Sequence, residues 1–224
     1  MTSAVVSCQG LSAGYLGVAA VRDINLEVRP GQVVLLAGRN GAGKTTTLMA
    51  LAGALRPLTG EVHVQGELST DPLHRRVQRG LGLVTEKRCV VMGISVEDNL
   101  RLGSGDVRAA LEIFPELEQR RRTKAGLLSG GEQQMLVLAR VLAARPQMIL
   151  ADELSQGLAP LIVRRLLDAL RAAADDGIGV LLVEQHLRLA LEIADYTYFL
   201  RQGRINRSGP AKDLSESDIQ AAYL

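Results

Sequence analysis

The chain has 224 residues, 47% of them hydrophobic, with a net formal charge of +2, no tryptophan and only 3% aromatic residues. This length suits one α/β unit, residues 1–224, and the weak charge and few aromatic rings argue against nucleic acid as a partner. No run reaches the ~18 to 20 apolar residues of a membrane-spanning helix and no signal segment is evident, so we expect a cytosolic protein.

Short runs with the pattern of β-strands dominate the first third of the chain. The predicted strands span residues 5–9, 24–28, 33–37, 61–65 and 81–85. The third run is apolar throughout, which indicates a strand buried on both faces. A basic helical segment is expected around Arg75, Arg76 and Arg79.

Helical patterns replace strand patterns from about residue 86. The predicted helices span residues 96–102, 107–114 and 115–122, with no strong strand between them. We therefore expect a helical subdomain, about residues 86–135, inserted into the core.

Helix and strand alternate in the rest of the sequence. The predicted helices span residues 133–144, 160–174 and 187–194, and the predicted strands span 148–151 and 179–183. A hairpin of strands at 196–201 and 204–208 and a short helix after Ser215 end the chain. Such alternation builds a mostly parallel sheet flanked by helices.

A glycine-rich turn joins the buried strand at 33–37 to a predicted helix. It reads Gly38, Arg39, Asn40, Gly41, Ala42, Gly43, Lys44 and Thr45, followed by Thr46, which is typical of a phosphate-binding P-loop. Its glycines let backbone N–H groups surround phosphate oxygens, and the helix N-terminus attracts anions. We expect Lys44 to bind the β- and γ-phosphates and the Thr45 hydroxyl to hold Mg²⁺. A plain glycine-rich turn is the alternative.

Two carboxylates, Asp152 and Glu153, follow the apolar strand predicted at 148–151. They fall at the carboxyl ends of the strands, which is the edge of the sheet where α/β proteins bind ligands. We expect Asp152 to anchor Mg²⁺, directly or through water, and Glu153 to accept a proton from the attacking water. The alternative is a solvated acidic strand end, which the P-loop earlier in the chain disfavours.

A P-loop occurs in a large superfamily of proteins, and one further motif narrows the assignment within it. It reads Leu128, Ser129, Gly130, Gly131, Glu132, Gln133 and Gln134. Ser129 and Glu132 have the spacing of a helix capping box, which needs no ligand, but a plain cap needs no paired glycines. With them, the backbone at the helix N-terminus can approach an anion closely. On this motif and the P-loop the chain resembles the ABC ATPases over essentially its whole length.

That resemblance implies an α/β fold of the ABC type among P-loop NTPases. Such a fold has a mostly parallel sheet core, an N-terminal antiparallel β subdomain and the inserted helical subdomain. It also implies that residues 129–132 contact the γ-phosphate held by a second ATPase subunit, in a head-to-tail dimer. ATP and Mg²⁺ are the implied cofactors. Tyr15 lies where the family stacks an aromatic ring on adenine, with a packing role as the alternative.

More narrowly, the chain is similar to the shorter ATP-binding subunit of branched-chain amino acid importers. The residues that carry this likeness are 38–41, 96–100, 129–135, 157–160, 183–185 and 222–224. It implies integral-membrane permease subunits, a second ABC ATPase subunit, identical or different, and an external solute-binding protein as partners. The chain would then lie on the inner face of the cell membrane, with its permease contact at residues 86–99.

Several positions depart from the usual family pattern. Glu86 stands where most ABC ATPases have Gln, although the narrower group also tends to have Glu, and we expect it to bind Mg²⁺ and assist catalysis. Gln185 occupies the place of the switch histidine and is expected to donate a hydrogen bond to the γ-phosphate, with His186 one position later as the alternative. Leu154 replaces a usual Pro, and Gln156 lies in the loop that faces the partner subunit.

These residues together predict a competent ATPase that powers uptake of amino acids or similar small polar solutes. Two alternatives stay open: a non-hydrolysing regulatory subunit, suggested by Leu154, Gln156 and Gln185, and a soluble ABC ATPase without a transport role. Cys8, Cys89 and the three histidines are scattered, which argues against a zinc site.

Overall fold

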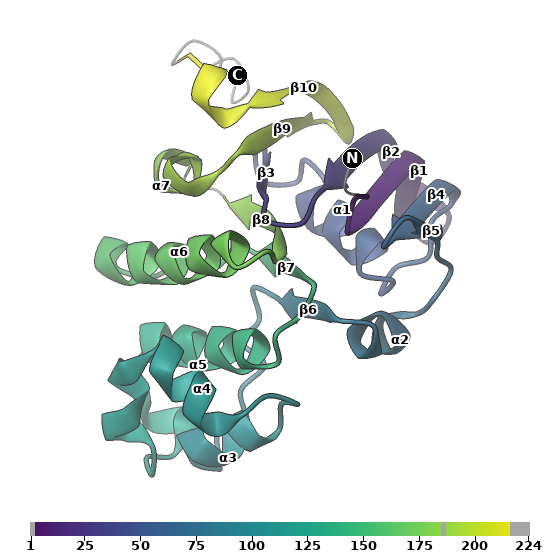
Figure 1. Cartoon of the computed structure of the whole chain (residues 1–224). Coiled ribbons are helices and arrows are strands. Elements are labelled where there is room, and N and C mark those ends of the chain that lie inside the picture. The colour runs from purple at the N-terminus through teal and green to yellow at the C-terminus, as the bar shows by residue number, and fades with distance from the viewer. Residues whose placement is uncertain (1–2, 185–186, 216–224) are drawn as a thin grey trace.

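A computed structural model describes residues 3–184 and 187–215 of the chain (Figure 1). Its larger sheet contains β3 (Val33–Ala37), β6 (Leu81–Val84), β7 (Met148–Asp152), β8 (Gly179–Glu184), β9 (Tyr196–Arg201) and β10 (Arg204–Pro210). The order across this six-stranded sheet is β10-β9-β3-β8-β7-β6, and every neighbouring pair is parallel except β10 with β9.

A second sheet, antiparallel, is built from the N-terminal part of the chain. Its strands are β1 (Val6–Tyr15), β2 (Val18–Val28), β4 (Thr59–Val64) and β5 (Glu67–Leu68), in the order β2-β1-β4-β5. The predicted mostly parallel core and N-terminal antiparallel sheet are therefore both confirmed.

Helices flank the larger sheet on both faces (Figure 1). The α-helices of the described residues are α1 (Lys44–Leu51), α2 (Leu73–Gln78), α3 (Val96–Arg101), α4 (Val107–Ile113), α5 (Gly130–Ala143), α6 (Pro160–Asp175) and α7 (Leu187–Ile193). Short 3₁₀ helices span Pro115–Arg120, Ala125–Leu127 and Ala211–Asp213. Within the described residues, no helix is both long and apolar enough to cross a membrane.

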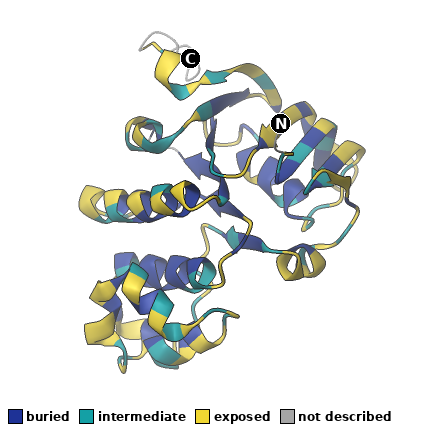
Figure 2. Cartoon of the chain, viewed as in Figure 1, coloured by how far each residue is buried: buried dark blue, intermediate teal, exposed yellow. Residues whose placement is uncertain are grey.

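The central strand β3 serves two hydrophobic cores at once. Alternate side chains of a strand point to opposite faces. Val33, Leu35 and Ala37 accordingly pack in one core with α5, α6 and α7, whereas Val34 and Leu36 pack in the other with α1 and the antiparallel sheet. Figure 2 shows the central strands β3, β7 and β8 as a buried layer between partly exposed helices, whereas the edge strand β10 is mostly exposed. This double burial explains why the sequence of β3 is apolar without alternation.

Some predicted bounds are wrong. The strands predicted at 5–9 and 24–28 are parts of a longer hairpin, because β1 continues to Tyr15 and β2 begins at Val18. The register between them shifts at several points, so the alternation that reveals a strand is interrupted. β5 was not predicted, the segment predicted as a helix at 115–122 is a 3₁₀ helix, and the helix predicted at 133–144 begins earlier, at Gly130. The helix predicted after Ser215 lies outside the described residues.

Candidate functional site

The P-loop connects the end of β3 to the first turn of α1. Gly43 is the N-cap of α1 and has a φ of 106°, a conformation that a side chain disfavours. A Cβ atom at this position would also lie 2.3 Å from Val21 Cγ1 on β2. Both observations make glycine necessary here. This glycine turns the backbone so that α1 begins at Lys44, whose side chain is only 4% exposed.

Lys44 is held inside its own loop in this structure. Its Nζ donates hydrogen bonds to the carbonyl oxygens of Gly38, at 3.0 Å, and Arg39, at 3.3 Å. It also lies 3.5 Å from Glu153 Oε1. A cation with carbonyl and carboxylate partners in a buried position can exchange them for phosphate oxygens.

Asp152 ends β7 and is 2% exposed. Burial raises its pKa to about 6 from an ordinary value of 3.8, a rise that a hydrogen bond from the Thr45 hydroxyl opposes. The neighbouring carboxylates of Glu153 and Glu86 raise the pKa further, and the Lys44 cation lowers it. Among the described residues, Asp152 Oδ1 has no hydrogen-bond partner.

Glu153 has an unusual backbone conformation. Its φ is 48°, in the left-handed region, which costs a non-glycine residue about 1 to 3 kcal/mol. Its backbone N–H donates to the carbonyl oxygen of Val183 on β8, at 2.8 Å. This conformation turns the chain out of β7 and places the Glu153 carboxylate beside Lys44.

One cavity of ≈ 360 Å³ brings most of these groups together. It is lined by Ala20, Asn40, Gly41, Gly43, Lys44, Thr45, Thr46, Glu86, Glu153 and Gln156. Residues far apart in the sequence, from the P-loop, the end of β6 and the end of β7, therefore face one space. Ala20 is a lining residue that the sequence analysis did not identify, and no motif marks it.

Four of the predicted nucleotide-binding residues do not line this cavity. Arg39 and Ala42 line an adjacent space of ≈ 300 Å³ with Leu200, Arg201 and Gln202, at the β9–β10 turn. Gly38 is packed tightly, because a Cβ there would lie 2.3 Å from the Leu200 carbonyl oxygen. Tyr15 is 56% exposed and ends β1, beside the exposed side chains of Leu16 and Val18. An exposed ring in an apolar turn is accessible for stacking on a base. The exposure of Tyr15 does not support the alternative that the ring packs inside the protein.

The donor set fits a magnesium ion bound with a nucleotide. The site offers an unpartnered Asp152 oxygen, the Thr45 hydroxyl bonded to the same carboxyl group and the nearby Glu86 carboxylate. Oxygen ligands of this kind, together with phosphates and water, are those Mg²⁺ prefers. The buried cation of Lys44 and the P-loop backbone fit the phosphates themselves.

The N-terminus of α5 is predicted to contact the γ-phosphate held by a second subunit, and its capping hydrogen bonds are all made within this chain. The Ser129 hydroxyl accepts the Glu132 N–H at 3.2 Å, and Glu132 Oε2 accepts the Ser129 N–H at 2.7 Å, which is a capping box. Glu132 also lies 3.2 Å from Arg120 Nε.

The paired glycines of α5 are packed against this chain's own side chains. A Cβ at Gly130 would lie 2.8 Å from Arg88 Nη1, and one at Gly131 would lie 2.9 Å from Ile162 Cγ2. Paired glycines would let an anion approach the backbone of the helix closely, which predicts a ligand site here. Within this chain, the contact with Ile162 also favours glycine at position 131, whereas the flexible end of the Arg88 side chain could move away from a side chain at position 130.

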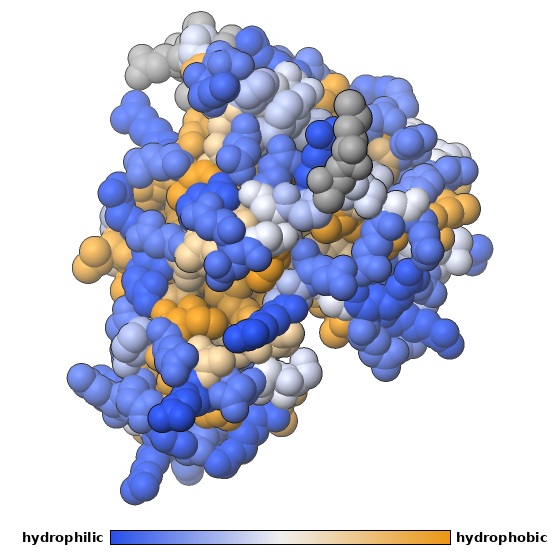
Figure 3. Space-filling view, in the orientation of Figure 1, coloured by the Kyte–Doolittle hydropathy of each residue, from blue (hydrophilic) through white to orange (hydrophobic). Residues whose placement is uncertain are grey.

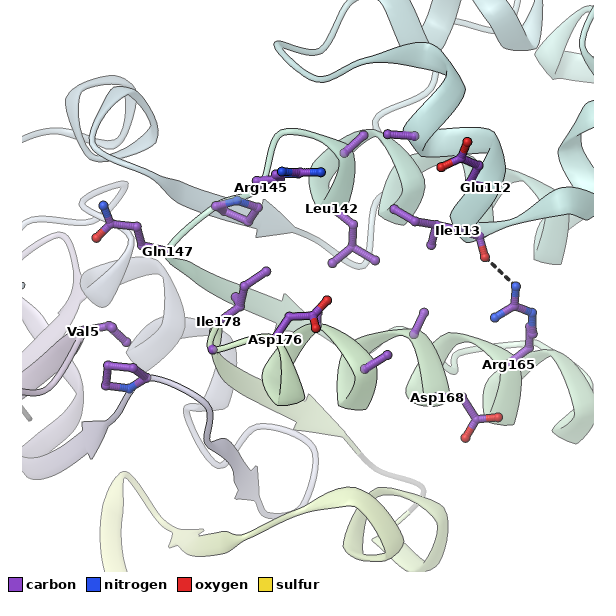
Figure 4. Close-up of a pocket in the computed structure, with 18 residues that line it drawn as sticks. Val5, Glu112, Ile113, Leu142, Arg145, Gln147, Arg165, Asp168, Asp176 and Ile178 are labelled. Atoms are coloured by element: carbon purple, nitrogen blue, oxygen red, sulfur yellow. Dashed lines mark hydrogen bonds between the residues drawn. The ribbon is translucent and has the colours of Figure 1, made fainter.

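A larger space of ≈ 1140 Å³ lies away from the P-loop (Figure 4). It separates α4 and α5 from α6, and apolar side chains gather between these layers in Figure 3. Arg165 of α6 spans its end, donating to the Ile113 carbonyl oxygen at 2.5 Å and pairing with Glu116 at 2.9 Å. Neither Glu86 nor Glu153, the carboxylates predicted to be catalytic, lines this space, so size does not identify the candidate site.

A buried pair beside the site was also missed from the sequence. Glu184, at the end of β8, is 1% exposed and accepts two hydrogen bonds from Ser155, in the loop after Glu153. The sequence feature that could have indicated Glu184 is a carboxylate at the end of an apolar strand. Gln185, His186 and residues 222–224 lie outside the described residues, so their predicted roles have no structural test.

Comparison with known proteins agrees with this geometry. The family model described as "ABC transporter" matches residues 21–156. The high-affinity branched-chain amino acid transport ATP-binding protein BraG of Pseudomonas aeruginosa is 36% identical, over 98% of this chain and 99% of that protein. The lipopolysaccharide export system ATP-binding protein LptB of Escherichia coli is 33% identical, over 99% of this chain and 97% of that protein.

Solved structures give the same fold. A structure titled as the ATP binding subunit of an ABC transporter superposes with a TM-score of 0.83, at 27% identity, over 93% of this chain and 91% of that chain.

Proposed function

The chain is an ATPase subunit of the ABC transporter family, and on that premise we propose that it powers the uptake of amino acids, or similar small polar solutes, through a separate permease. The observation that carries the ATPase part is the single cavity shared by Lys44, Thr45, Glu86 and Glu153, with Asp152 behind it. Similarity to BraG supports amino acids of the branched-chain type as the solute. A second candidate, export of a lipid-linked saccharide, is supported by the similarity to LptB.

In this proposal the chain's own residues divide the work of ATP hydrolysis. Lys44 gives up its contacts with the Gly38 and Arg39 carbonyl oxygens and binds the β- and γ-phosphates. Thr45, Asp152 and Glu86 would hold Mg²⁺, which neutralises negative charge on the phosphates when bound. Gln185 would donate a hydrogen bond to the γ-phosphate, and Tyr15 would stack on adenine.

Glu153 acts as the general base. Water attacks the γ-phosphorus, the bond to the oxygen bridging the β- and γ-phosphates breaks, and the Glu153 carboxylate accepts a proton from that water. The 3.5 Å contact between Glu153 and Lys44 must lengthen once phosphate binds Lys44, which frees the carboxylate for the water.

A second ATPase subunit completes the site. Its residues equivalent to Ser129, Gly130, Gly131 and Glu132 would face the γ-phosphate, since the helix N-terminus favours anions. A second copy of this chain and a longer ATPase relative are both consistent with the proposal. Arg88, which already lies against Gly130, brings positive charge to that surface.

The permease would contact the exposed apolar side chains after Glu86. Val91 and Met92 are 47% and 49% exposed, and Leu127, 78% exposed, follows Gly126, whose N–H donates to the Met92 carbonyl oxygen at 3.0 Å. We place the chain, with its permease, on the inner face of the cell membrane, and an external solute-binding protein belongs to the same proposal.

The test is to isolate the partners of a trapped subunit. Tagged Glu153→Gln protein is recovered from detergent-solubilised host membranes with Mg-ATP, and its partners are identified by mass spectrometry. Glu112→Gln, an exposed carboxylate on α4, is the matched control. Recovery of a multi-helix permease with an amino-acid-binding partner supports import; recovery of a lipopolysaccharide export complex supports the second candidate; recovery of soluble proteins alone overturns the transport role.

A further inference from the structure

Glu184 is a buried carboxylate that the hydrolysis scheme above does not use. It is 1% exposed at the end of β8, where an unpartnered charge would be strongly unfavourable. Its Oε1 accepts the Ser155 backbone N–H at 2.9 Å, and its Oε2 accepts the Ser155 hydroxyl at 2.5 Å. We propose that Glu184 is a positioning residue that acts through Ser155 to hold the loop bearing the general base Glu153. This inference rests on the proposed role of Glu153.

The loop at 153–157 needs such a partner because its backbone is strained. Glu153 has a φ of 48° and Gly157 a φ of 70°, so a left-handed residue lies at each end of the loop. Left-handed non-glycine residues persist only where surrounding contacts determine them. Ser155 lies midway, is 2% exposed, and its carbonyl oxygen accepts the Leu158 N–H at 3.1 Å.

Two successive residues of β8 anchor this loop. The Val183 carbonyl oxygen accepts the Glu153 N–H at 2.8 Å, and Glu184 holds Ser155. β8 lies beside β7 in register, with Asp152 opposite Val183, so these anchors continue the ladder beyond the last residue of β7. The position of the Glu153 carboxylate in the cavity is therefore set partly by Glu184. Gln156, which lines the same cavity, follows Ser155 directly.

A carboxylate suits this position for a definite reason. Ser155 presents two donors, the backbone N–H and the hydroxyl, and one carboxylate offers an oxygen to each. An apolar residue in place of Glu184 would leave a buried N–H unpaired. Replacement by alanine should release the loop while the P-loop residues and Asp152 stay unchanged.

The first experiment separates positioning from binding. ATP hydrolysis is measured against ATP concentration for wild type and Glu184→Ala, each assembled with its second ATPase subunit. We expect kcat to fall roughly 10- to 100-fold, because a misplacement near 1 Å has effects of that size. KM for ATP should change less than about threefold, since interactions made in the ground state are kept. Ser155→Ala should lower kcat by a smaller factor, because the backbone N–H bond remains.

Conservative variants and a stability control exclude a merely structural role. Glu184→Gln keeps an oxygen for the Ser155 N–H and adds an amide donor for its hydroxyl, so most of kcat should return. Adding Ser155→Ala to Glu184→Ala should lower kcat little further, because both changes break the same contact. Val180→Ala, a buried change earlier on β8, should reduce stability but leave kcat per folded molecule unchanged.

A second measurement does not depend on hydrolysis. Amide hydrogen exchange over residues 153–158 should be faster in Glu184→Ala than in wild type or Val180→Ala. Unchanged exchange, or an unchanged kcat in an active Glu184→Ala protein, overturns the inference. A wild-type protein that hydrolyses no ATP when assembled with its second ATPase subunit, or a Glu153→Gln variant as active as wild type, overturns the proposed role of Glu153 instead.

Discussion

The nucleotide cavity and the N-terminus of α5 are expected to face phosphate in one assembled site, yet this chain builds them in opposite ways. Within the described residues, the cavity is lined by Glu153, whose backbone is strained, and behind it lies an Asp152 oxygen without a hydrogen-bond partner. The N-terminus of α5 satisfies its own donors through the reciprocal bonds of Ser129 and Glu132. The cavity therefore gives up stability for ligand binding, whereas the cap contributes stability by itself.

This difference predicts how substitutions act in the two regions. In the cavity, a change should reduce function more than it reduces stability, and one change should even stabilise the fold. At the α5 cap, the same kind of change should reduce stability directly.

The largest effect is expected from Glu153→Gln in the cavity. Loss of the general base should lower kcat for ATP hydrolysis by ~10² to 10⁴, while Mg-ATP still binds. Phosphate release and ATP binding measured on the same preparations check this. Glu112→Gln should behave as wild type; an equal loss in both variants would show that charge, and not the position of Glu153, is responsible.

Asp152→Asn should increase the free energy of unfolding while lowering the rate of ATP hydrolysis. The folded-state pKa of Asp152 is raised from 3.8 to about 6, so ionisation of this carboxyl group opposes folding at neutral pH. The stabilisation should be roughly 1 to 3 kcal/mol, because one pKa unit corresponds to about 1.36 kcal/mol. It should be complete above about pH 6 and disappear below pH 3.8, where the carboxyl group is protonated in both states.

Urea unfolding of both proteins from pH 4 to pH 8 tests the sign. A difference that grows as the pH falls contradicts the assignment of a raised pKa, and equal stability at all pH values removes the contrast with the α5 cap.

Ser129→Ala should destabilise the fold, in contrast to Asp152→Asn. Loss of an N-cap hydroxyl costs about 1 kcal/mol, with a range of roughly 0.5 to 2. Thermal unfolding measures it, and Ser129→Thr, which keeps the hydroxyl, is the matched control. A stability equal to wild type would mean that the capping box seen at α5 contributes nothing.

The smallest effect is expected for Arg120→Gln, next to the same cap. Its pair with Glu132 is partly exposed, at 55% for Arg120 and 25% for Glu132. Such pairs contribute about 0.2 to 1 kcal/mol and weaken with added salt. Unfolding with and without 0.5 M salt distinguishes this pair from the capping bonds, whose contribution should persist.

Local patterns in the sequence were enough to predict the parts of the site that one chain segment builds. The bounds of β3 are those predicted, because a strand buried on both faces is apolar at every position. Lys44, Thr45, Asp152 and Glu153 were found because each lies in a short motif beside a strand. The cavity does join the P-loop with Glu86 and Glu153.

Local patterns did not predict the contacts between segments that are far apart in the sequence. Ser155 and Glu184 are 29 residues apart and meet only because β7 and β8 are neighbours. The early hairpin was missed because bulges interrupt its alternation. The capping box was foreseen from spacing, but the packing of Gly130 against Arg88 was not, since nothing in either segment indicates the other.

The position of β6 at the margin of the large sheet has a mechanical consequence. The helices α3, α4 and α5 leave the sheet from this outermost strand and return at its neighbour β7. Both chain connections of this segment are thus at one border, and the hydrogen bonds among β10, β9, β3, β8 and β7 do not involve it. A rotation of the segment about that border would leave β3 at the interior of the sheet, but it would have to change the packing of α5 against β3 and α6 as well as the Arg165 contacts to Ile113 and Glu116.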